Sequence, residues 1–370
     1  MIETLWTLLK KPGWLQRAIR TDAVLPAEHE VADWRTYRPD TKEDGAHISA
    51  SPYYFEWWYF DVSYQADSAL SVIFHMTDLI RPASSTGSIN ISILTHGRPP
   101  FHRFIQYPRD QIWASTEKCE VRVGNNRCWV EGERRYHIQI REAGLQIELE
   151  FEPLTISWRP GQGRVEFGRP EAFFAWVVPQ PKARVTGWIQ LNGDEREIEG
   201  IGYHDHNWGT VSLLDTAKHW SWGRIYLEEL TCVYSDIHFS ERYGGRRLMP
   251  FAVFDDKSVL ISSLLGKDDP LDRQNDFLRS PGTVNSPSGW ELAWQKGDEK
   301  LQISLRTREV LEKADLLSGS RLRKWLIGQL IAHPFYIRCL CSANALWEDG
   351  QRTRSLEGTA ICEQISLQRE

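Results

Sequence analysis

Short runs of alternating apolar and polar residues, separated by turn residues, dominate the sequence. Aromatic and β-branched residues fill segments 53–62 and 69–76, which predicts two strands joined by a turn. The dipeptide Asn192-Gly193 separates two more predicted strands and is typical of a two-residue hairpin loop. Because many short strands follow one another and long helical patterns are rare, the sequence predicts an all-β sandwich or barrel with a few short helices.

The predicted strands fall into two groups along the 370-residue chain, a length that suits two domains. Each group has an aromatic strand near its beginning, Glu56-Trp-Trp-Tyr59 in the first and His219-Trp-Ser-Trp222 in the second. We therefore expect an N-terminal helix with a connecting segment at 1–48, a first β-domain at 49–212 and a second at 213–370.

Composition and charge narrow the class of ligand. Tryptophan is abundant, with 17 Trp against 3 Met, which indicates broad apolar cavities or heavy packing on the sheets. The net charge of -6 argues against nucleic acid as a partner, because phosphate recognition needs concentrated positive charge. The six Cys show no CxxC or zinc-ribbon spacing, so we expect buried, reduced thiols. The expected partner is an apolar small molecule.

The lengths of the apolar segments indicate where in the cell the protein is located. No apolar run approaches the roughly 20 residues that span a bilayer, and the N-terminus is a poor signal peptide, so we expect a cytoplasmic location. Apolar residues near the N-terminus predict a short helix that packs on the β-domain, and helical spacing recurs at 321–331. The alternative for either helix is a weak contact with a membrane surface.

One stretch concentrates reactive side chains, Gly200-Ile-Gly-Tyr-His-Asp-His-Asn-Trp-Gly209. Alternation in the residues before it predicts that the stretch continues a strand. Side chains of a strand alternate between its two faces. One face therefore carries Tyr203, Asp205 and Asn207, and the other carries His204, His206 and Trp208.

The face with Asp205 has the composition of an acid site. A carboxyl group enclosed by aromatic side chains loses solvation, so its pKa rises and it can protonate a trisubstituted alkene. Aromatic rings would stabilise the tertiary cation, and a water held by Tyr203 or Asn207 could capture it. In the alternative interpretation, Asp205 caps a turn by accepting backbone N–H groups.

The other face could offer two imidazoles to a metal ion. A third ligand, such as His75, His219 or His238, would be needed, and the sequence does not place one nearby. We expect no metal, with His204 and His206 bracing the fold through hydrogen bonds.

The two aromatic strands add further candidates. Glu56 lies among aromatic residues, so we expect it to be buried in an ion pair with Arg224 or a His; the alternative is a second carboxylate in the pocket. Trp220 and Trp222 share a face if they lie on a strand, where they pack in the core or line the pocket.

These motifs resemble a known family. In order and spacing, Glu56-Trp-Trp-Tyr59, the 200–209 stretch and Trp220-x-Trp-Gly-Arg224 resemble the carotenoid 1,2-hydratase (hydroxyneurosporene synthase) and AttH-like superfamily, which includes lipocalin-like Diels–Alderases. Gly358-Thr-Ala-Ile-Cys-Glu363 resembles the closing Gly-rich strand of that family, with its Glu. The resemblance implies two lipocalin-like β-barrel domains, with an apolar pocket at or between them and no cofactor or metal.

The resemblance also implies that Asp205 is the acid, with Tyr203 beside it. Segment 173–179 keeps Trp176 but lacks the His that hydratase sequences tend to carry upstream of the motif. We expect Asp205 at the wall of an apolar cavity near the junction of the domains, with a raised pKa and a Trp in contact. An ion pair between Asp205 and Arg224 would exclude the acid role.

We therefore expect a cofactor-independent enzyme that hydrates or cyclises a C=C bond of a long apolar, isoprenoid or polyene-type molecule after protonating it. A pericyclase of the Diels–Alder type is the alternative enzyme. A lipocalin-like carrier of an apolar ligand is the non-catalytic alternative. Catalysis is assigned to Asp205 and Tyr203. Substrate binding is assigned to Trp57, Tyr59, Glu56, Trp176, Asn207, Trp208, Trp220 and Trp222.

Overall fold

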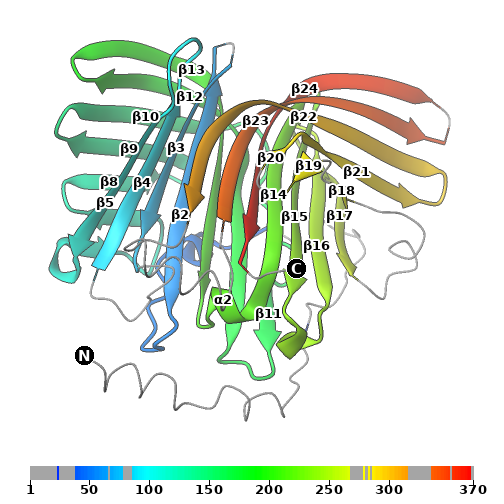
Figure 1. Cartoon of the computed structure of the whole chain (residues 1–370), viewed down its shortest axis with the longest axis horizontal. Helices are drawn as coiled ribbons and strands as arrows, with labels where there is room; N and C mark the ends of the chain where they lie inside the picture. Colours follow the sequence, from blue (N-terminus) through cyan, green and yellow to red (C-terminus); the bar gives the residue numbers. More distant parts are fainter. Residues whose placement is uncertain are drawn as a thin grey trace.

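The structure is a computed structural model that describes residues 23–24, 38–65, 67–77, 86–266, 278–279, 282–283, 286–315, 335–350 and 352–367. Strands dominate these residues and form two large antiparallel sheets. Figure 1 shows the two sheets side by side, the first in blue to green and the second in green to red. Each sheet curls into a barrel-like shape, so the predicted all-β fold with two lipocalin-like barrels is confirmed.

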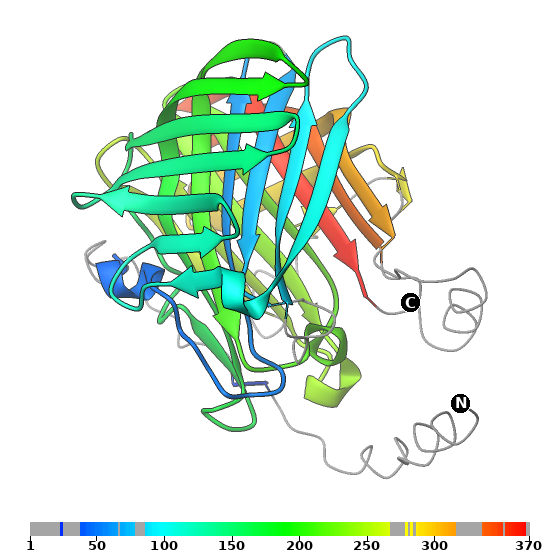
Figure 2. The ribbon, with the colours of Figure 1, turned by 90° about the vertical axis from the view of Figure 1, so that its left-hand side faces the viewer.

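The first sheet has 13 strands, and its curved outer face is turned to the viewer in Figure 2. In the order of hydrogen bonding, the main path is β5 (Phe101–Pro108), β4 (Thr86–Leu94), β3 (Ser68–His75), β2 (Phe55–Tyr64), β13 (Asp194–Gly209), β12 (Phe173–Leu191), β10 (Leu145–Pro153), β9 (Arg135–Glu142), β8 (Asn126–Glu131), β7 (Glu120–Val123) and β6 (Ile112–Ala114). Off this path, β12 also pairs with β11 (Arg164–Phe167), which pairs with β1 (Ala23–Val24).

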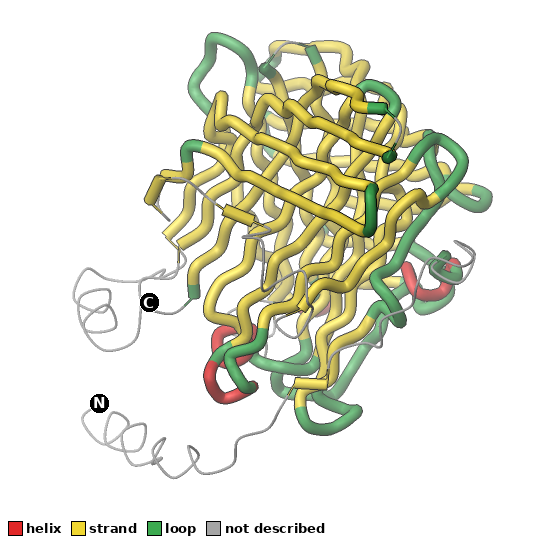
Figure 3. The backbone as a smooth tube through the Cα atoms, turned by 90° about the vertical axis from the view of Figure 1, so that its right-hand side faces the viewer, coloured by secondary structure: helices red, strands yellow, loops and turns green. Residues whose placement is uncertain are grey.

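The second sheet has nine strands and is turned to the viewer in Figure 3. Its order is β17 (Val259–Gly266), β16 (Arg247–Phe254), β15 (Leu230–Phe239), β14 (Ala217–Leu227), β24 (Thr353–Ser366), β23 (Phe335–Asp349), β22 (Glu299–Asp315), β21 (Gly289–Lys296) and β18 (Leu278–Arg279). A separate pair joins β19 (Gly282–Thr283) to β20 (Ser286–Pro287).

The described helices are all short: η3 (Thr41–Asp44), η4 (Arg109–Gln111), α2 (Leu213–Thr216) and η5 (Glu241–Tyr243). None of them is long and apolar enough to cross a membrane. The predicted N-terminal helix and the predicted helix at 321–331 lie outside the described residues.

The hairpin between β12 and β13 follows the sequence prediction. Leu191 pairs with Asp194, so Asn192 and Gly193 form a two-residue loop. Both loop residues have positive φ, at 53° and 87°, as the favoured two-residue hairpin turn requires. This turn fixes the register of two long central strands, one of which carries the 200–209 stretch.

Each barrel has its own apolar core, and a third cluster lies between the sheets. Alternation along β2 divides its side chains: Trp58 and Phe60 enter the core of the first barrel, and Tyr59 joins the third cluster. The third cluster also contains Val233 and Phe254 of the second sheet. Both faces of β2 are therefore buried, which explains its nearly continuous run of aromatic residues.

Buried polar contacts also join the two sheets. The guanidinium of Arg224 on β14 donates to Oδ1 of Asp61 on β2 at 2.7 Å and to the hydroxyl of Ser63 at 2.8 Å. Arg338 on β23 donates to the hydroxyl of Ser71 on β3 at 2.8 Å. These directional bonds help to set the positions of the sheets relative to each other.

Candidate active site

Residues 200–209 form the second half of β13, as the sequence predicts. The hydroxyl of Tyr203 donates to Oδ2 of Asp205 at 2.9 Å, and the side-chain amide of Asn207 donates to Oδ1 at 2.9 Å. The three residues lie two positions apart, so the strand presents them on one face. The predicted shared face is confirmed.

A fourth residue reaches Asp205 from the neighbouring strand. The indole N–H of Trp176 on β12 donates to Oδ2 of Asp205 at 3.0 Å. Just beyond this contact the register of β12 against β13 shifts twice, around Gln180, where Pro179 and Pro181 lack the N–H that a regular ladder needs. The expectation of a Trp in contact with Asp205 is therefore confirmed.

Asp205 is nearly inaccessible to solvent, with 4% of its surface exposed. Burial raises its pKa from 3.8 to about 7, although the hydrogen bonds from Trp176 and Tyr203 act in the opposite direction because they stabilise the anion. Asp205 makes no ion pair with an Arg or Lys of the described residues, since Arg224 binds Asp61 instead. The predicted rise in pKa is confirmed, and the ion pair that would exclude the acid role is not formed.

Aromatic rings of both sheets pack around Tyr203 and Trp176, the two residues that bind Oδ2 of this carboxyl group. The ring centroid of Trp222 on β14 lies 5.1 Å from that of Tyr203 and 5.3 Å from that of Tyr59. On another side, Trp158 packs edge-on against Trp176, with centroids 5.5 Å apart. The 203–208 segment therefore lies near the junction of the two barrels, as predicted, and a ligand cavity in front of Asp205 remains a prediction.

Two other proposed binding residues lie at the margin of this cluster. Trp57 is half-buried opposite Asn207 in the ladder, so it shares the face of Asp205, and its ring packs against Phe174. Trp220 lies on the same face of β14 as Trp222 but packs in a separate apolar cluster with Tyr336.

Glu56 and Trp208 lie on the opposite face of the first sheet from Asp205, so the structure does not bring them to the acid. Oε1 of Glu56 accepts from His206 at 3.0 Å and from the backbone N–H of His47 at 2.7 Å. Burial acts to raise the pKa of Glu56, but these contacts outweigh it and hold the pKa at about 2. The predicted pairing with a His is confirmed, and the alternative partner Arg224 is wrong.

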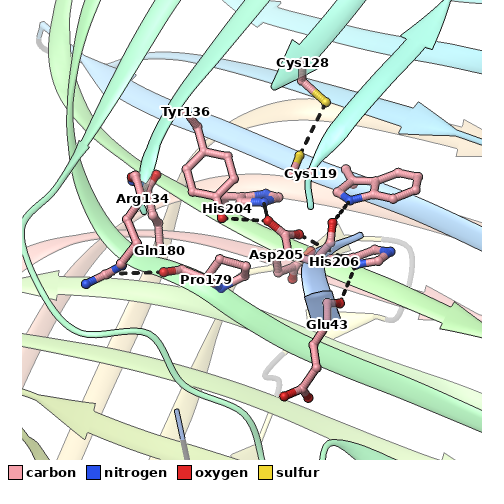
Figure 4. Close-up of polar contacts among 12 residues, drawn as sticks. Glu43, Cys119, Cys128, Arg134, Tyr136, Pro179, Gln180, His204, Asp205 and His206 are labelled. Atoms are coloured by element: carbon pink, nitrogen blue, oxygen red, sulfur yellow. Dashed lines mark hydrogen bonds and ion pairs between the residues drawn. The ribbon is translucent and has the colours of Figure 1, made fainter. Parts of the chain in front are cut away.

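His204 is also fixed on this second face. Its Nδ1 lies 2.9 Å from the backbone oxygen of Tyr59, and its Nε2 lies 3.3 Å from Oδ2 of Asp44, which also accepts from Tyr136 at 2.6 Å. Figure 4 shows Tyr136 beside His204, with His206 bonded to the backbone of Glu43. Although burial acts to lower it, Asp44 raises the pKa of His204 to about 10. The predicted bracing role of the two His is confirmed.

The same face contains residue types that bind metal ions. Among the described residues, two groups have ligand atoms within 4.8 Å of one another: Asp44, Cys119 and His204, and His47, Glu56 and His206. The ring nitrogens of His204 and His206 lie within hydrogen-bond distance of carbonyl and carboxylate oxygens, and these contacts hold both rings in place. The third ligands considered from the sequence belong to neither group; they are His75, His219 and His238.

Sequence reasoning missed Asp61 and Arg338, two of the charged residues at the junction. Asp61 shares the face of Tyr59 by alternation, which could have placed it near Asp205, but no sequence pattern pairs it with Arg224. Arg338 donates to Oε2 of Glu363 at 3.3 Å and lies over the ring of Tyr59, 4.9 Å from its centroid. These contacts depend on how the two sheets pack against each other, and the residue pattern of a single strand does not predict that packing.

Comparisons with known proteins agree with this architecture. A family model described as a domain of unknown function, DUF7064, matches residues 40–264, more than half of the chain. Hydroxyneurosporene dehydrogenase of Chlorobaculum tepidum is 25% identical over 237 residues, which cover 53% of this chain and 59% of that protein. Quinolone epoxide rearrangement protein penF of Penicillium thymicola is 24% identical over 246 residues, which cover 63% of this chain and 59% of that protein. The chain thus spans about six tenths of the length of these relatives.

Solved structures share the fold over nearly the whole chain. The crystal structure of CghA with Sch210972 has a TM-score of 0.66 at 12% identity, covering 95% of this chain and 99% of that one. Kievitone hydratase from Nectria haematococca has a TM-score of 0.57 at 13% identity, covering 94% and 98%. At these identities the similarity establishes a shared fold.

Proposed function

The chain belongs to the DUF7064 family, within the AttH-like, lipocalin-like superfamily, and we propose that it is an enzyme that adds water to, or cyclises, a C=C bond of an apolar small molecule. The observation that carries this proposal is the carboxyl group of Asp205, which is buried among aromatic rings and has a pKa of about 7. Much of it is therefore protonated at neutral pH, as an acid catalyst must be.

The surrounding side chains suit a cationic reaction. A proton from Asp205 to one alkene carbon leaves a tertiary cation, which the rings of Tyr59, Tyr203 and Trp222 would stabilise through their π-electrons. The amide of Asn207 and the hydroxyl of Tyr203 hold the orientation of the carboxyl group. Attack by water and loss of one of its protons complete hydration. Attack by an internal double bond forms a ring and a new cation, and loss of a proton from that cation completes cyclisation. Neither path requires a cofactor.

The names of similar proteins support this chemistry. Kievitone hydratase is named for a hydration, and the relative from Penicillium thymicola is named for an epoxide rearrangement. A buried acid can initiate either reaction, by protonating carbon or oxygen. The substrate we propose is a long isoprenoid or polyene, because the described lining of the junction is mainly aromatic and aliphatic.

Incubation with apolar alkenes in deuterated water tests the proposal. We expect deuterium at one alkene carbon of the product, and a loss of at least about 100-fold in rate for Asp205→Asn, which keeps the shape of the side chain but not the acid. A product without deuterium that Asp205→Asn still forms would indicate a pericyclase, in which the pocket only folds the substrate. Binding of the alkenes with no product would indicate a carrier.

A further inference from the structure

We propose that Glu363 is a second catalytic carboxyl group, which faces Asp205 across the aromatic junction and accepts the proton of the attacking water. This inference rests on the proposed function, because it takes Asp205 as the acid.

The first observation is the position of Glu363 in the second sheet. On β24 it lies directly opposite Trp222 of β14 on one side and Arg338 of β23 on the other. Residues opposite each other share a face of the sheet, so Glu363 points toward the first sheet as Trp222 does. The ring of Trp222 contacts Tyr203, whose hydroxyl binds Asp205. The two carboxyl groups therefore lie on opposite sides of one aromatic cluster.

The second observation is that Glu363 is held by one oxygen and free at the other. Its Oε2 accepts from the hydroxyl of Tyr336 at 2.8 Å and from Arg338 at 3.3 Å. Its Oε1 accepts no hydrogen bond from the described residues, and 15% of the side chain is exposed. A carboxylate fixed in this way presents its other oxygen as an acceptor to an incoming water.

The third observation is a contrast with a neighbouring carboxylate. Glu312 also binds Arg338, and both of its oxygens are occupied, by Asn90, Ser92, His102 and Arg338. Burial acts to raise the pKa of Glu312, but its partners hold it at about 2, whereas burial raises the pKa of Glu363. The charge of Arg338 is already balanced by Glu312, so a structural role does not require the second carboxylate.

The proposed step balances as an addition of water to an alkene. The O–H bond of Asp205 breaks, and the π-electrons of the alkene form a new C–H bond. A lone pair of water then forms the C–O bond to the cation, while one O–H bond of that water breaks and its proton passes to Oε1 of Glu363. Asp205 ends as a carboxylate and Glu363 as a carboxylic acid. After the alcohol leaves, the proton returns to Asp205 through solvent water.

Electrostatic coupling between the two groups can be measured without a substrate. The charge of Glu363 acts to raise the pKa of Asp205. The pKa of Asp205 can be followed by infrared titration of the protonated carboxyl band, with Asp205→Asn as the reference. Glu363→Gln should lower this pKa, because it removes the charge of Glu363. Glu357→Gln, an exposed Glu on the same strand, is the matched control and should leave it unchanged. If the pKa of Asp205 is unchanged in Glu363→Gln, the two carboxyl groups are not coupled and the proposal is wrong.

A probe reaction separates the base from the acid. With lycopene in deuterated water, Glu363→Gln should still exchange deuterium into the alkene, because the cation forms and collapses, but should produce alcohol about 100-fold more slowly. Asp205→Asn should do neither, and Glu363→Asp should recover part of the alcohol. If Glu363→Gln forms the alcohol at the wild-type rate, Glu363 is not the base that accepts the proton of water. If the wild-type protein neither hydrates lycopene nor exchanges deuterium into it, the proposed function fails for this probe, and the infrared titration still decides whether the two carboxyl groups are coupled.

Discussion

Trp176 and Asp205 form a hydrogen bond between adjacent strands although they are not opposite each other in the ladder. The residue opposite Trp176 is Asn207, two positions along β13, and the indole N–H reaches diagonally to Oδ2 of Asp205 at 3.0 Å. Large aromatic side chains can span such a diagonal. The same ring that encloses the carboxyl group therefore also stabilises its charged form, so burial and hydrogen bonding act on the pKa in opposite directions.

Substitution of Trp176 by Phe should raise the pKa of Asp205 above its value of about 7. The ring keeps most of the apolar enclosure, but the anion loses one N–H donor, which corresponds to about one to two pKa units. Infrared titration against Asp205→Asn measures the shift. Trp158→Phe is the matched control, because Trp158 packs on Trp176 but donates to Ser262 instead. A pKa that stays the same or falls in Trp176→Phe would contradict this account.

The free energy of unfolding should depend on pH through Asp205. Its pKa is about 7 in the folded protein and 3.8 as the unperturbed reference, so the folded state holds the proton more tightly between these values. The resulting stability is fully present below pH 3.8, falls as pH rises and is lost above about pH 7. The total loss is about 4 kcal/mol.

Urea unfolding of the wild-type protein and Asp205→Asn from pH 4 to 8 isolates this contribution, because other titrating groups are common to both proteins. The free energy of unfolding of the wild-type protein should fall relative to that of the variant as the pH rises toward 7. Above that pH the two curves should run parallel. Parallel curves throughout would mean that Asp205 titrates at its ordinary value.

Local alternation explains how much of the acid cluster the sequence could predict. Tyr203, Asp205 and Asn207 lie two residues apart on one strand, and their shared face follows from strand geometry alone. The Asn192-Gly193 hairpin likewise depends on two adjacent residues and a positive φ. Both features are local, so the sequence carries them directly.

Contacts between distant segments could not be predicted in this way. Asp44 lies 160 residues from His204, and Asp61 lies 163 residues from Arg224. Either carboxylate could have been assigned to several cations, because the register of one barrel against the other depends on the packing of whole sheets. The sequence interpretation accordingly considered Arg224 as a partner of Glu56, which lies on the other face of β2.

Substitution of Asp61 by Asn should destabilise the protein by about 3–5 kcal/mol, because Arg224 would stay buried without its counter-charge. Both side chains are fully inaccessible to solvent in the folded protein. Urea unfolding measures the loss, and the double variant Asp61→Asn, Arg224→Met should recover part of it. Glu152→Gln, which breaks a half-exposed pair with Arg135, should have a much smaller effect. Equal effects of the two single variants would show that burial of the Asp61 pair is unimportant.

Asp44 should contribute strongly to the stability of the protein, because it keeps His204 protonated on the face of the first sheet opposite Asp205. The pKa of His204 is about 10 in the folded protein, against 6.5 as reference, so its stabilising contribution is complete below pH 6.5 and is lost as pH rises through about 10. At pH 7, Asp44→Asn should lower the free energy of unfolding by about 3–5 kcal/mol, since a buried imidazolium loses its partner. Nuclear magnetic resonance of the imidazole should also show that the pKa of His204 has fallen.

Glu43→Gln, in the same short helix, is the control, because its pair with Arg159 is partly exposed and should contribute much less. If Asp44→Asn leaves the pKa of His204 near 10, another group must hold its proton, and the role assigned to Asp44 is wrong.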